Sequence, residues 1–445
     1  MSVETSRDER VVEALDEYIA QSEGELVQML QTMVRFNTVS VDLEPGSEHT
    51  TNDEKALQEF IGGRLSALGA EIDQWEPAVA ELRDHPMMPS WHHWNDRPIT
   101  VGLLRGSGGG RSLIINGHID VVSAGDEERW TSPPFAAEIR DGRVYGRGAV
   151  DMKGGIAAAI CALEALKAAG VKLKGDVIVE AVTDEETCAM GTVAAIQRGY
   201  RADGGLVPEP TGLNFWIATR GLLHGSFTVP GRSAHAEMNQ CHWRAGGGVN
   251  SIAKAAPLIA ALDQLSSEWA TRDDKQHRLL GSPQAQPTVV SGGAFISNVP
   301  ESCQVHINAT YLPGNADDAG YGTFPRREIQ DRVEAIARED DWLAANDLVW
   351  SWATDYPPSE IDRAEEILRA TGLAVSSLGF EPKLEGIDTT YDGALLTRLA
   401  GVPSPAFGPG DLSRAHALDE WIGIDELVLG ARAYARAICE WCSVS

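Results

Sequence analysis

Strands and helices alternate in the first half of the chain, and this alternation constrains the fold more than any other feature of the sequence. Two short apolar runs, SLIIN at 112–116 and DVIVEAVT at 176–183, have the composition of buried strands. The segment at 154–169 between them is helical, and a helix at 192–198 precedes a further strand at 205–207. Alternation at this spacing is typical of an α/β fold. We therefore expect a mixed, mainly parallel sheet flanked by helices.

The pattern changes after Phe215. A β-rich segment, a helix, two paired strands and a second helix follow in that order, which is typical of an α+β unit with an antiparallel sheet. Helices and a short strand return from about residue 358. A chain of 445 residues is long enough for two or three compact units. We predict a domain at 218–355 inserted into a larger domain made of 1–217 and 356–445.

The charge balance excludes several classes of partner. Lys and Arg number 37 and Asp and Glu number 65, which gives a net charge of −28. Such an excess of negative charge argues against binding to nucleic acid or to an anionic membrane, and it favours metal cations as ligands. Six scattered cysteines are too few for a disulfide scaffold. The sequence has no apolar signal core and no run of 18 apolar residues, so we expect a cytoplasmic protein.

Residues that bind metals or transfer protons follow the predicted strands. They are His118 and Asp120 in GHID, Asp151 before a glycine-rich helix start, Glu185 and Glu186 in DEE, Glu209 in PEP, and His416 in AHALDEW. Taken singly, each has an ordinary structural explanation, such as a hydrogen-bonded core histidine or a helix N-cap. Together, two imidazoles and three carboxylates suit two borderline divalent cations, with one carboxylate bridging. In the arrangement that satisfies this count, Asp151 bridges, His118 and Glu209 complete one site, and Glu186 and His416 complete the other.

Two further carboxylates lie beside these residues. Asp120 is two positions from His118, so on an extended segment both side chains point to the same side. A carboxylate there is placed to accept the second ring N–H of the histidine. Glu185 neighbours a ligand but points elsewhere, and it is free to take a proton from a water molecule held between the cations.

The motifs GHIDVV, DGRVYGRGAVDMKGG, DEE, PEP, GRSAHA, NVP, FGPG and AHALDEW occur in this order from about Pro98 to the C-terminus. In sequence and order they resemble the M20 metallopeptidase family, and most of all its acetylornithine deacetylase and succinyl-diaminopimelate desuccinylase-like branch. The resemblance implies a zinc-peptidase-like catalytic domain, a lid and dimerisation domain at 218–355, and two zinc ions, although N/O ligands also admit cobalt or manganese.

The resemblance also implies roles for single residues. His118, Asp151, Glu186, Glu209 and His416 match the metal ligands, Glu185 the general base and Asp120 the carboxylate behind the histidine ligand. A cis peptide bond is expected after Asp151. His235 in GRSAHA matches a histidine that helps hold the oxyanion in the active site of the partner subunit, so a homodimer through the lid domain is expected. Arg220 and Asn298 match positions that line the substrate pocket.

Two features depart from the family pattern or stand outside it. Many relatives carry an arginine in a D-x-R-Y-x-P segment, where this chain has Asn308 and Thr310 in NATYLP. Threonine cannot clamp a substrate carboxylate, so Arg220, Arg326 or Arg327 takes that role or the substrate differs from an ordinary N-acyl amino acid. The stretch SWHHWND at residues 90–96 is interpreted as a packed loop rather than a substrate lid or a third metal site.

The function expected from these residues and the resemblance is that of a di-zinc amidohydrolase acting on an N-acyl amino acid or a related small amide. Glu185 would take the proton of the attacking water and deliver it to the leaving amine, and His235 would help to stabilise the oxyanion. Hydrolysis of dipeptides, as by a dipeptidase or carboxypeptidase, or of N-carbamoyl compounds on the same metals is the first alternative. A metal-binding relative without catalysis is the least favoured.

Overall fold

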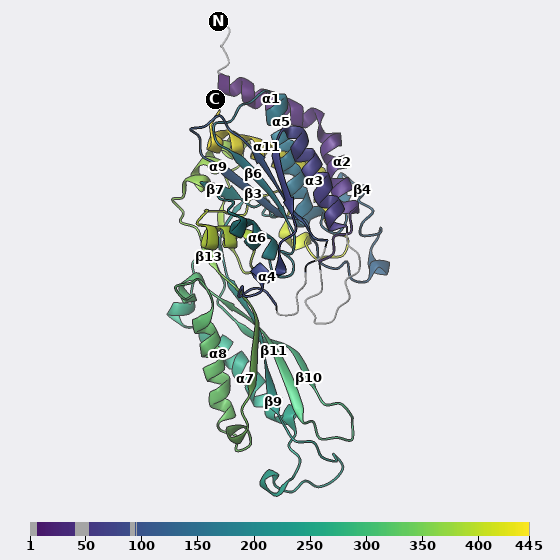
Figure 1. Ribbon diagram of the computed structural model, residues 1–445, viewed down its shortest axis with the longest axis vertical. Coiled ribbons are helices and arrows are strands. Elements are labelled where there is room, and N and C mark those ends of the chain that lie inside the picture. Colours follow the sequence, from purple (N-terminus) through teal and green to yellow (C-terminus); the bar gives the residue numbers. More distant parts are fainter. Residues whose placement is uncertain (1–6, 41–52, 90–93, 95, 445) are drawn as a thin grey trace.

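The structure, a computed structural model, describes residues 7–40, 53–89, 94 and 96–444. Figure 1 shows a broad body of helices around a central sheet and a narrower, elongated body that extends from one end of it. In the Trp/His stretch predicted as a loop, positions 90–93 and 95 lie outside the described residues, while Trp94 is buried.

The broad body is built on a five-stranded sheet. Its order is β1-β2-β6-β3-β7, with strands β1 (Glu71–Trp75), β2 (Ile99–Leu104), β3 (Leu113–His118), β6 (Val177–Val182) and β7 (Gly204–Leu206). The strands β6, β3 and β7 are parallel, while β1 and β2 pair antiparallel at one side. Every residue of β3 and β6 is buried, as expected for strands covered on both faces. The mixed α/β fold predicted from the sequence is confirmed.

Helices cover both faces of this sheet (Figure 1). They are α1 (Arg7–Gln21), α2 (Glu23–Arg35), α3 (Glu54–Leu68), α5 (Gly154–Ala168), α6 (Met190–Arg198), α9 (Glu366–Ser376) and α11 (Ile424–Cys442), with the short helices α4 (Val79–Leu82) and α10 (Asp392–Leu395). The helix α5 is rich in Ala and nearly all buried, because it packs against α1, α2 and α11 as well as β3. The first two helices, α1 and α2, meet at Ser22.

Two small sheets complete the broad body. One has the order β15-β5-β4, from β4 (Glu138–Arg140), β5 (Arg143–Tyr145) and β15 (Trp421–Gly423). The other has the order β13-β8-β14, from β8 (Phe215–Thr219), β13 (Ser359–Glu360) and β14 (Leu384–Ile387). Both join segments that are far apart in the sequence, so they tie the C-terminal part of the chain to segments from its first half.

The narrow body is a four-stranded antiparallel sheet with two helices. Its order is β10-β11-β9-β12, from β9 (Gly221–Pro230), β10 (Ala285–Gly292), β11 (Ser302–Tyr311) and β12 (Val349–Tyr356), and α7 (Ser251–Trp269) and α8 (Thr323–Ala337) pack beside it. Its hydrophobic core is separate and is made by residues between Leu223 and Trp352. Burial alternates along β11, as a sheet with one covered face requires. The domain boundaries at 218 and 355 stay a prediction.

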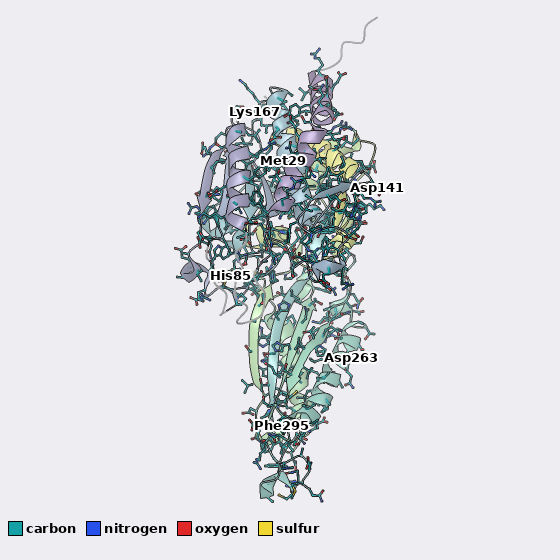
Figure 2. The ribbon with its side chains drawn as sticks, turned by 90° about the vertical axis from the view of Figure 1, so that its right-hand side faces the viewer. Met29, His85, Asp141, Lys167, Asp263 and Phe295 are labelled. Carbon is teal, nitrogen blue, oxygen red and sulfur yellow. The ribbon has the colours of Figure 1, made fainter. Side chains whose placement is uncertain are left out.

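Figure 2 shows how the two bodies meet. His85 lies at the junction, and Phe295 lies towards the far end of the narrow body. The ring of His85 contacts Tyr321 of the narrow body with 3.4 Å between Nε2 and the hydroxyl, and the Asp355 amide donates to the carbonyl of Pro86 at 3.1 Å. Among the helices of the described residues, none is both long enough and apolar enough to cross a membrane.

A buried carboxyl group inside the central sheet makes stability depend on pH. Glu180 of β6 is 1% exposed, and burial raises the pKa of its carboxyl to about 7, although it accepts a hydrogen bond from Asn116 at 2.9 Å. The stability gained from the bound proton is full below pH 4.5 and is lost as the pH rises through 7. Replacing Glu180 with glutamine should therefore stabilise the protein at pH 8 relative to pH 5, by at most about 3 kcal/mol.

Urea unfolding at pH 5 and pH 8 measures this difference, and glutamine at the exposed Glu138 of β4 is the matched control. The control should leave the pH dependence of the free energy of unfolding unchanged. An equal pH dependence in wild type and in Glu180→Gln would contradict the prediction.

Candidate active site

The first residue of the site stands at the end of β3. His118 is 1% exposed, and its Nδ1 lies 3.0 Å from the carbonyl oxygen of Asp120. With the Nδ1 proton donated to that carbonyl, the lone pair of Nε2 faces Asp151, 3.2 Å away, and Glu209, 3.9 Å away. The local fold therefore fixes the orientation of the ring and directs Nε2 towards the carboxylates of Asp151 and Glu209.

The Asp120 carboxylate does not make the contact with the His118 ring that was predicted for it. Its nearest oxygen is 3.8 Å from His118 Nδ1, beyond hydrogen-bond distance, and the backbone carbonyl makes that contact instead. The carboxylate accepts hydrogen bonds from the backbone amides of Glu185 and Glu186, at 3.2 and 3.1 Å. The sequence spacing correctly placed Asp120 beside the histidine. Its carboxylate oxygens, however, accept hydrogen bonds from the amides of Glu185 and Glu186 in the turn after β6.

Two groups of potential metal ligands share one residue. His118, Asp151 and Glu209 form one group and Asp151, Glu186 and His416 the other, and within each group the ligand atoms lie within 4.8 Å of one another. His416 Nε2 is 3.2 Å from Glu186 and 3.4 Å from the second oxygen of Asp151. The structure thus brings together the five residues that the sequence pointed to, with Asp151 between the two groups.

The electrostatics of these groups show an excess of negative charge. Burial raises the pKa of Glu209 well above its ordinary value, and the nearby charge of Asp151 raises it further. Burial likewise raises the pKa of Glu186. Hydrogen bonds to Asp151 and Glu186 raise the pKa of His416 to about 10. The buried carboxylates repel one another when they are ionised, and two divalent cations would relieve this repulsion. Carboxylate oxygens and imidazole nitrogens are also ligands that such cations bind.

Glu185 lies beside both groups and belongs to neither. Its carboxylate lines the cavity over the site, and Oε2 is 3.9 Å from His118 Nε2. Burial raises its pKa well above the ordinary value of a glutamic acid, against the opposing effect of His118. A carboxyl group with a raised pKa at the edge of a ligand cluster is suited to take up and release a proton during a reaction.

Sequence reasoning missed a buried ion pair that holds two of the candidate ligands. Glu420 accepts hydrogen bonds from the backbone amides of Val150 and Asp151, at 3.0 and 3.2 Å, and from Arg147 Nη1 at 2.7 Å. Arg147 Nη2 donates to the carbonyl of His416 at 3.4 Å. Arg147 lies in the motif YGRGAVDMKGG and Glu420 lies in AHALDEW. Their place in these two motifs was the signal by which the sequence could have pointed to them. The cis peptide bond expected after Asp151 is confirmed.

A cavity of about 210 Å³ opens over the candidate ligands. Besides Glu185 and four of the five candidate ligands, all but His118, its lining consists of Thr187, Trp216, Leu222, His224, Tyr356, Thr389, Thr390, Tyr391 and Leu412. The cavity is therefore acidic at its base and aromatic, apolar and hydroxyl-bearing on its walls. Among the residues that the structure describes, no lysine or arginine lines it.

His224 comes from the narrow body, and it was not predicted from the sequence because it follows the alternation of an ordinary strand. It stands on β9, and Nε2 lies 3.3 Å from the side-chain amide of Asn308 on β11. Burial lowers the pKa of its ring, so the neutral form is favoured. His224 is thus an uncharged hydrogen-bonding group on the wall of the cavity.

The residues predicted to bind substrate do not line this cavity. Arg220 donates from Nε to the carbonyl of Asp388 and from Nη1 to the carbonyl of Ser282, at 3.1 and 2.9 Å. His235 and Asn298 lie in the narrow body, where they form an antiparallel bridge with each other. The structure brings these two together, but neither lines the cavity over the ligands of their own chain.

The arginines considered as substitutes for the missing clamp are also engaged elsewhere. Arg326 donates to Asp355 at 2.8 Å, and the exposed Arg327 lies 3.7 Å from Asp331 on α8. The Thr310 hydroxyl accepts a hydrogen bond from the amide of Gln284. None of these side chains lines the cavity, so none of the three arginines is placed in this chain to act as the clamp.

Comparison with known proteins agrees with this geometry. The family model described as Peptidase family M20/M25/M40 matches residues 114–440. The N-formyl-4-amino-5-aminomethyl-2-methylpyrimidine deformylase of Halalkalibacterium halodurans is 30% identical over 97% of the chain and 98% of that protein. The succinyl-diaminopimelate desuccinylase of Dechloromonas aromatica is 30% identical over 73% of the chain and 82% of that protein.

Among solved structures, a Bacillus subtilis protein described as a dinuclear metal binding peptidase from the M20 family has a TM-score of 0.62 at 15% identity. The similarity covers 94% of the chain and 98% of that protein. At this level of identity, the similarity shows a shared fold across both bodies.

Proposed function

We propose that this chain, which belongs to the peptidase family M20/M25/M40, removes a formyl or similarly small acyl group from the amine of an uncharged heteroaromatic compound. The chain is a metal-dependent amide hydrolase. The observation that carries the substrate proposal is the cavity itself, which joins two groups of potential metal ligands to walls where no lysine or arginine is found among the described residues.

The donor set supports two divalent cations, and we propose zinc, with cobalt or manganese also suited to these ligands. His118 and Glu209 would hold one cation, Glu186 and His416 the other, and Asp151 both. When bound, such a pair supplies Lewis acidity to an amide carbonyl and lowers the pKa of water. A cytoplasmic location, expected from the sequence, is part of this proposal.

The residues around the ligands support the proton transfers of amide hydrolysis. The Glu185 carboxylate is placed to take a proton from the attacking water and to return it to the leaving nitrogen, since it lines the cavity and ligates in neither group. Asp120 holds the backbone of Glu185 by its amide. The reaction consumes one water and yields a carboxylic acid, formic acid in the case of a formamide, and the free amine.

The walls of the cavity support an aromatic and uncharged substrate. Trp216 and Tyr391 pack edge to face with 6.3 Å between ring centroids, and the Tyr391 hydroxyl is engaged by backbone carbonyls, so its ring offers an apolar surface. Neutral His224 and the threonine hydroxyls are suited to hydrogen-bond ring nitrogens and amino groups. A succinyl or amino-acid carboxylate would meet no lysine or arginine on the cavity walls among the described residues. The volume of about 210 Å³ is below the ~300–1,000 Å³ typical of sites for larger ligands.

A comparison of substrates tests this proposal. The metal-supplemented enzyme should hydrolyse N-formyl-4-amino-5-aminomethyl-2-methylpyrimidine with a kcat/KM at least about 10²-fold above that for N-succinyl-diaminopimelate, because a buried carboxylate without a partner is costly. N-acetyl and N-carbamoyl amino acids and dipeptides complete the panel, with amine release as the readout. Equal or faster hydrolysis of any of the carboxylate-bearing substrates would overturn the substrate proposal.

We further propose that the chain acts as a homodimer through the narrow body, with His235 of the partner subunit completing each site. This proposal is supported by the absence of His235 and Asn298 from the lining of the cavity of their own chain. It is also supported by a group of exposed apolar side chains nearby, where Met238, Phe295 and Ile296 are 64%, 65% and 94% exposed. Such a concentration of exposed apolar surface is typical of a protein interface.

A further inference from the structure

A buried arginine stands behind the candidate active site, and neither the ligand groups nor the cavity includes it. Arg97 follows the Trp/His stretch and is 1% exposed. Its Nε and Nη2 donate to the two oxygens of Glu54 at 2.8 and 3.1 Å, and Nη1 donates to Asp184 at 2.9 Å. The Trp94 indole donates to its carbonyl oxygen at 2.6 Å, which holds the backbone in place. Every nitrogen of the guanidinium therefore has a carboxylate partner.

Glu54 makes this arrangement rigid. It is the first residue of α3, it is fully buried, and it also accepts a hydrogen bond from the Thr183 hydroxyl at 2.6 Å. The bidentate pair fixes the plane of the guanidinium, as two parallel N–H···O bonds do. Only one direction then remains for Nη1, and it points to Asp184. An ammonium group at this position would not reproduce that fork.

Asp184 is the residue at which the chain turns from β6 towards the site. Its φ of 77° lies in a region that non-glycine residues rarely adopt, and its carbonyl accepts the amides of Thr187, Cys188 and Ala189. The next two residues are Glu185 and Glu186, whose amides Asp120 holds. The turn is thus held by Asp120 through the backbone and by Arg97 through the side chain of Asp184.

We propose that Arg97 is a positioning residue for hydrolysis: with Glu54 it fixes the Asp184 turn and thereby sets where the carboxylates of Glu185 and Glu186 lie. This inference rests on the proposed function, because it assigns Arg97 a part in that reaction. It acts through Asp184 and contacts neither the cavity nor a ligand atom. It also gives the segment after the Trp/His stretch a role in the reaction that its sequence did not suggest.

Arg97→Lys, Asp184→Asn and the double variant test the proposal in the Co²⁺-loaded, full-length enzyme. Arg97→Lys should lower kcat by about 10²-fold, the usual cost of a small misplacement of a catalytic group, while KM stays within threefold. The visible Co²⁺ spectrum should change as well, because the same turn carries Glu186. The double variant should be no slower than the slower single variant, since the two residues act as one unit. Arg105→Lys, at an exposed arginine, is the matched control.

Folding is controlled by circular dichroism, and Glu54→Gln is the second variant if Arg97→Lys does not fold. Glu54→Gln retains one oxygen acceptor for the guanidinium, and it should lower kcat at least tenfold at unchanged KM. A folded Arg97→Lys, or failing that a folded Glu54→Gln, with the wild-type kcat and Co²⁺ spectrum would overturn the proposal. So would multiplicative losses in the double variant. If wild type hydrolyses no amide, the proposed function fails, and the Co²⁺ spectrum alone decides on Arg97: an unchanged spectrum in the variant overturns its role.

Discussion

Replacing Glu185 with glutamine is expected to lower kcat by about 10²- to 10⁴-fold while the bound metal stays at the wild-type stoichiometry. The reason is that the Glu185 carboxylate lines the cavity but belongs to neither ligand group, so an amide of the same shape removes proton transfer without removing a ligand. Initial rates on the preferred substrate measure the first effect, and elemental analysis of the dialysed protein measures the second.

The exposed Glu128 offers a matched control, because its change to glutamine alters the charge equally and leaves the site untouched. Two results would contradict the assignment of Glu185. Full turnover by the variant would exclude it as the base, and loss of one metal equivalent would make it a ligand.

Three residues of the candidate site could be predicted from the sequence because they follow strands of the central sheet. The end of β3 places His118, and the turn after β6 places Glu185 and Glu186 at the same edge of the sheet. Parallel neighbours bring their carboxyl ends together, so an apolar run followed by a polar residue predicts a position in space as well as in sequence. Two neighbouring parallel strands were enough to bring three functional positions to one place.

The residues that fix the site geometry could not be predicted in the same way. Arg97 meets Glu54 across 43 positions and Asp184 across 87, and no periodicity links residues at such separations. His224 follows the alternation of an ordinary strand, and it becomes part of the cavity only because the narrow body brings β9 to the broad body. Local sequence patterns predict helices and strands. Which buried charged residues pair, and how the broad and narrow bodies meet, depends on the tertiary fold.

The contact predicted for Asp120 shows the same division. Spacing of two residues on an extended segment correctly placed its side chain near His118. It did not show that the amides of Glu185 and Glu186 would occupy both carboxylate oxygens, because those amides belong to a turn 65 residues away. The sequence thus predicts where a polar side chain lies, whereas the tertiary fold determines which groups form hydrogen bonds with it.

Mixing two inactive variants is expected to restore activity if His235 of the partner subunit completes each site. His235→Ala should lower kcat strongly, because a group that stabilises the oxyanion contributes about 10²- to 10³-fold. Glu185→Gln is inactive for the reason given above. In a mixed dimer with two-fold symmetry, one of the two sites combines the intact Glu185 of one subunit with the intact His235 of the other. The second site carries both defects.

Random exchange of equal amounts makes half of the dimers mixed, so about a quarter of wild-type activity should return. Native mass spectrometry of subunits with different tags measures the exchange, and the rate is compared with that of the unmixed variants. Activity that stays at the sum of the two variants despite complete exchange would place His235 outside the partner's site. Because His235 does not line the cavity of its own chain, it would then have no part in the reaction, and the homodimer would have to be tested by its mass in solution.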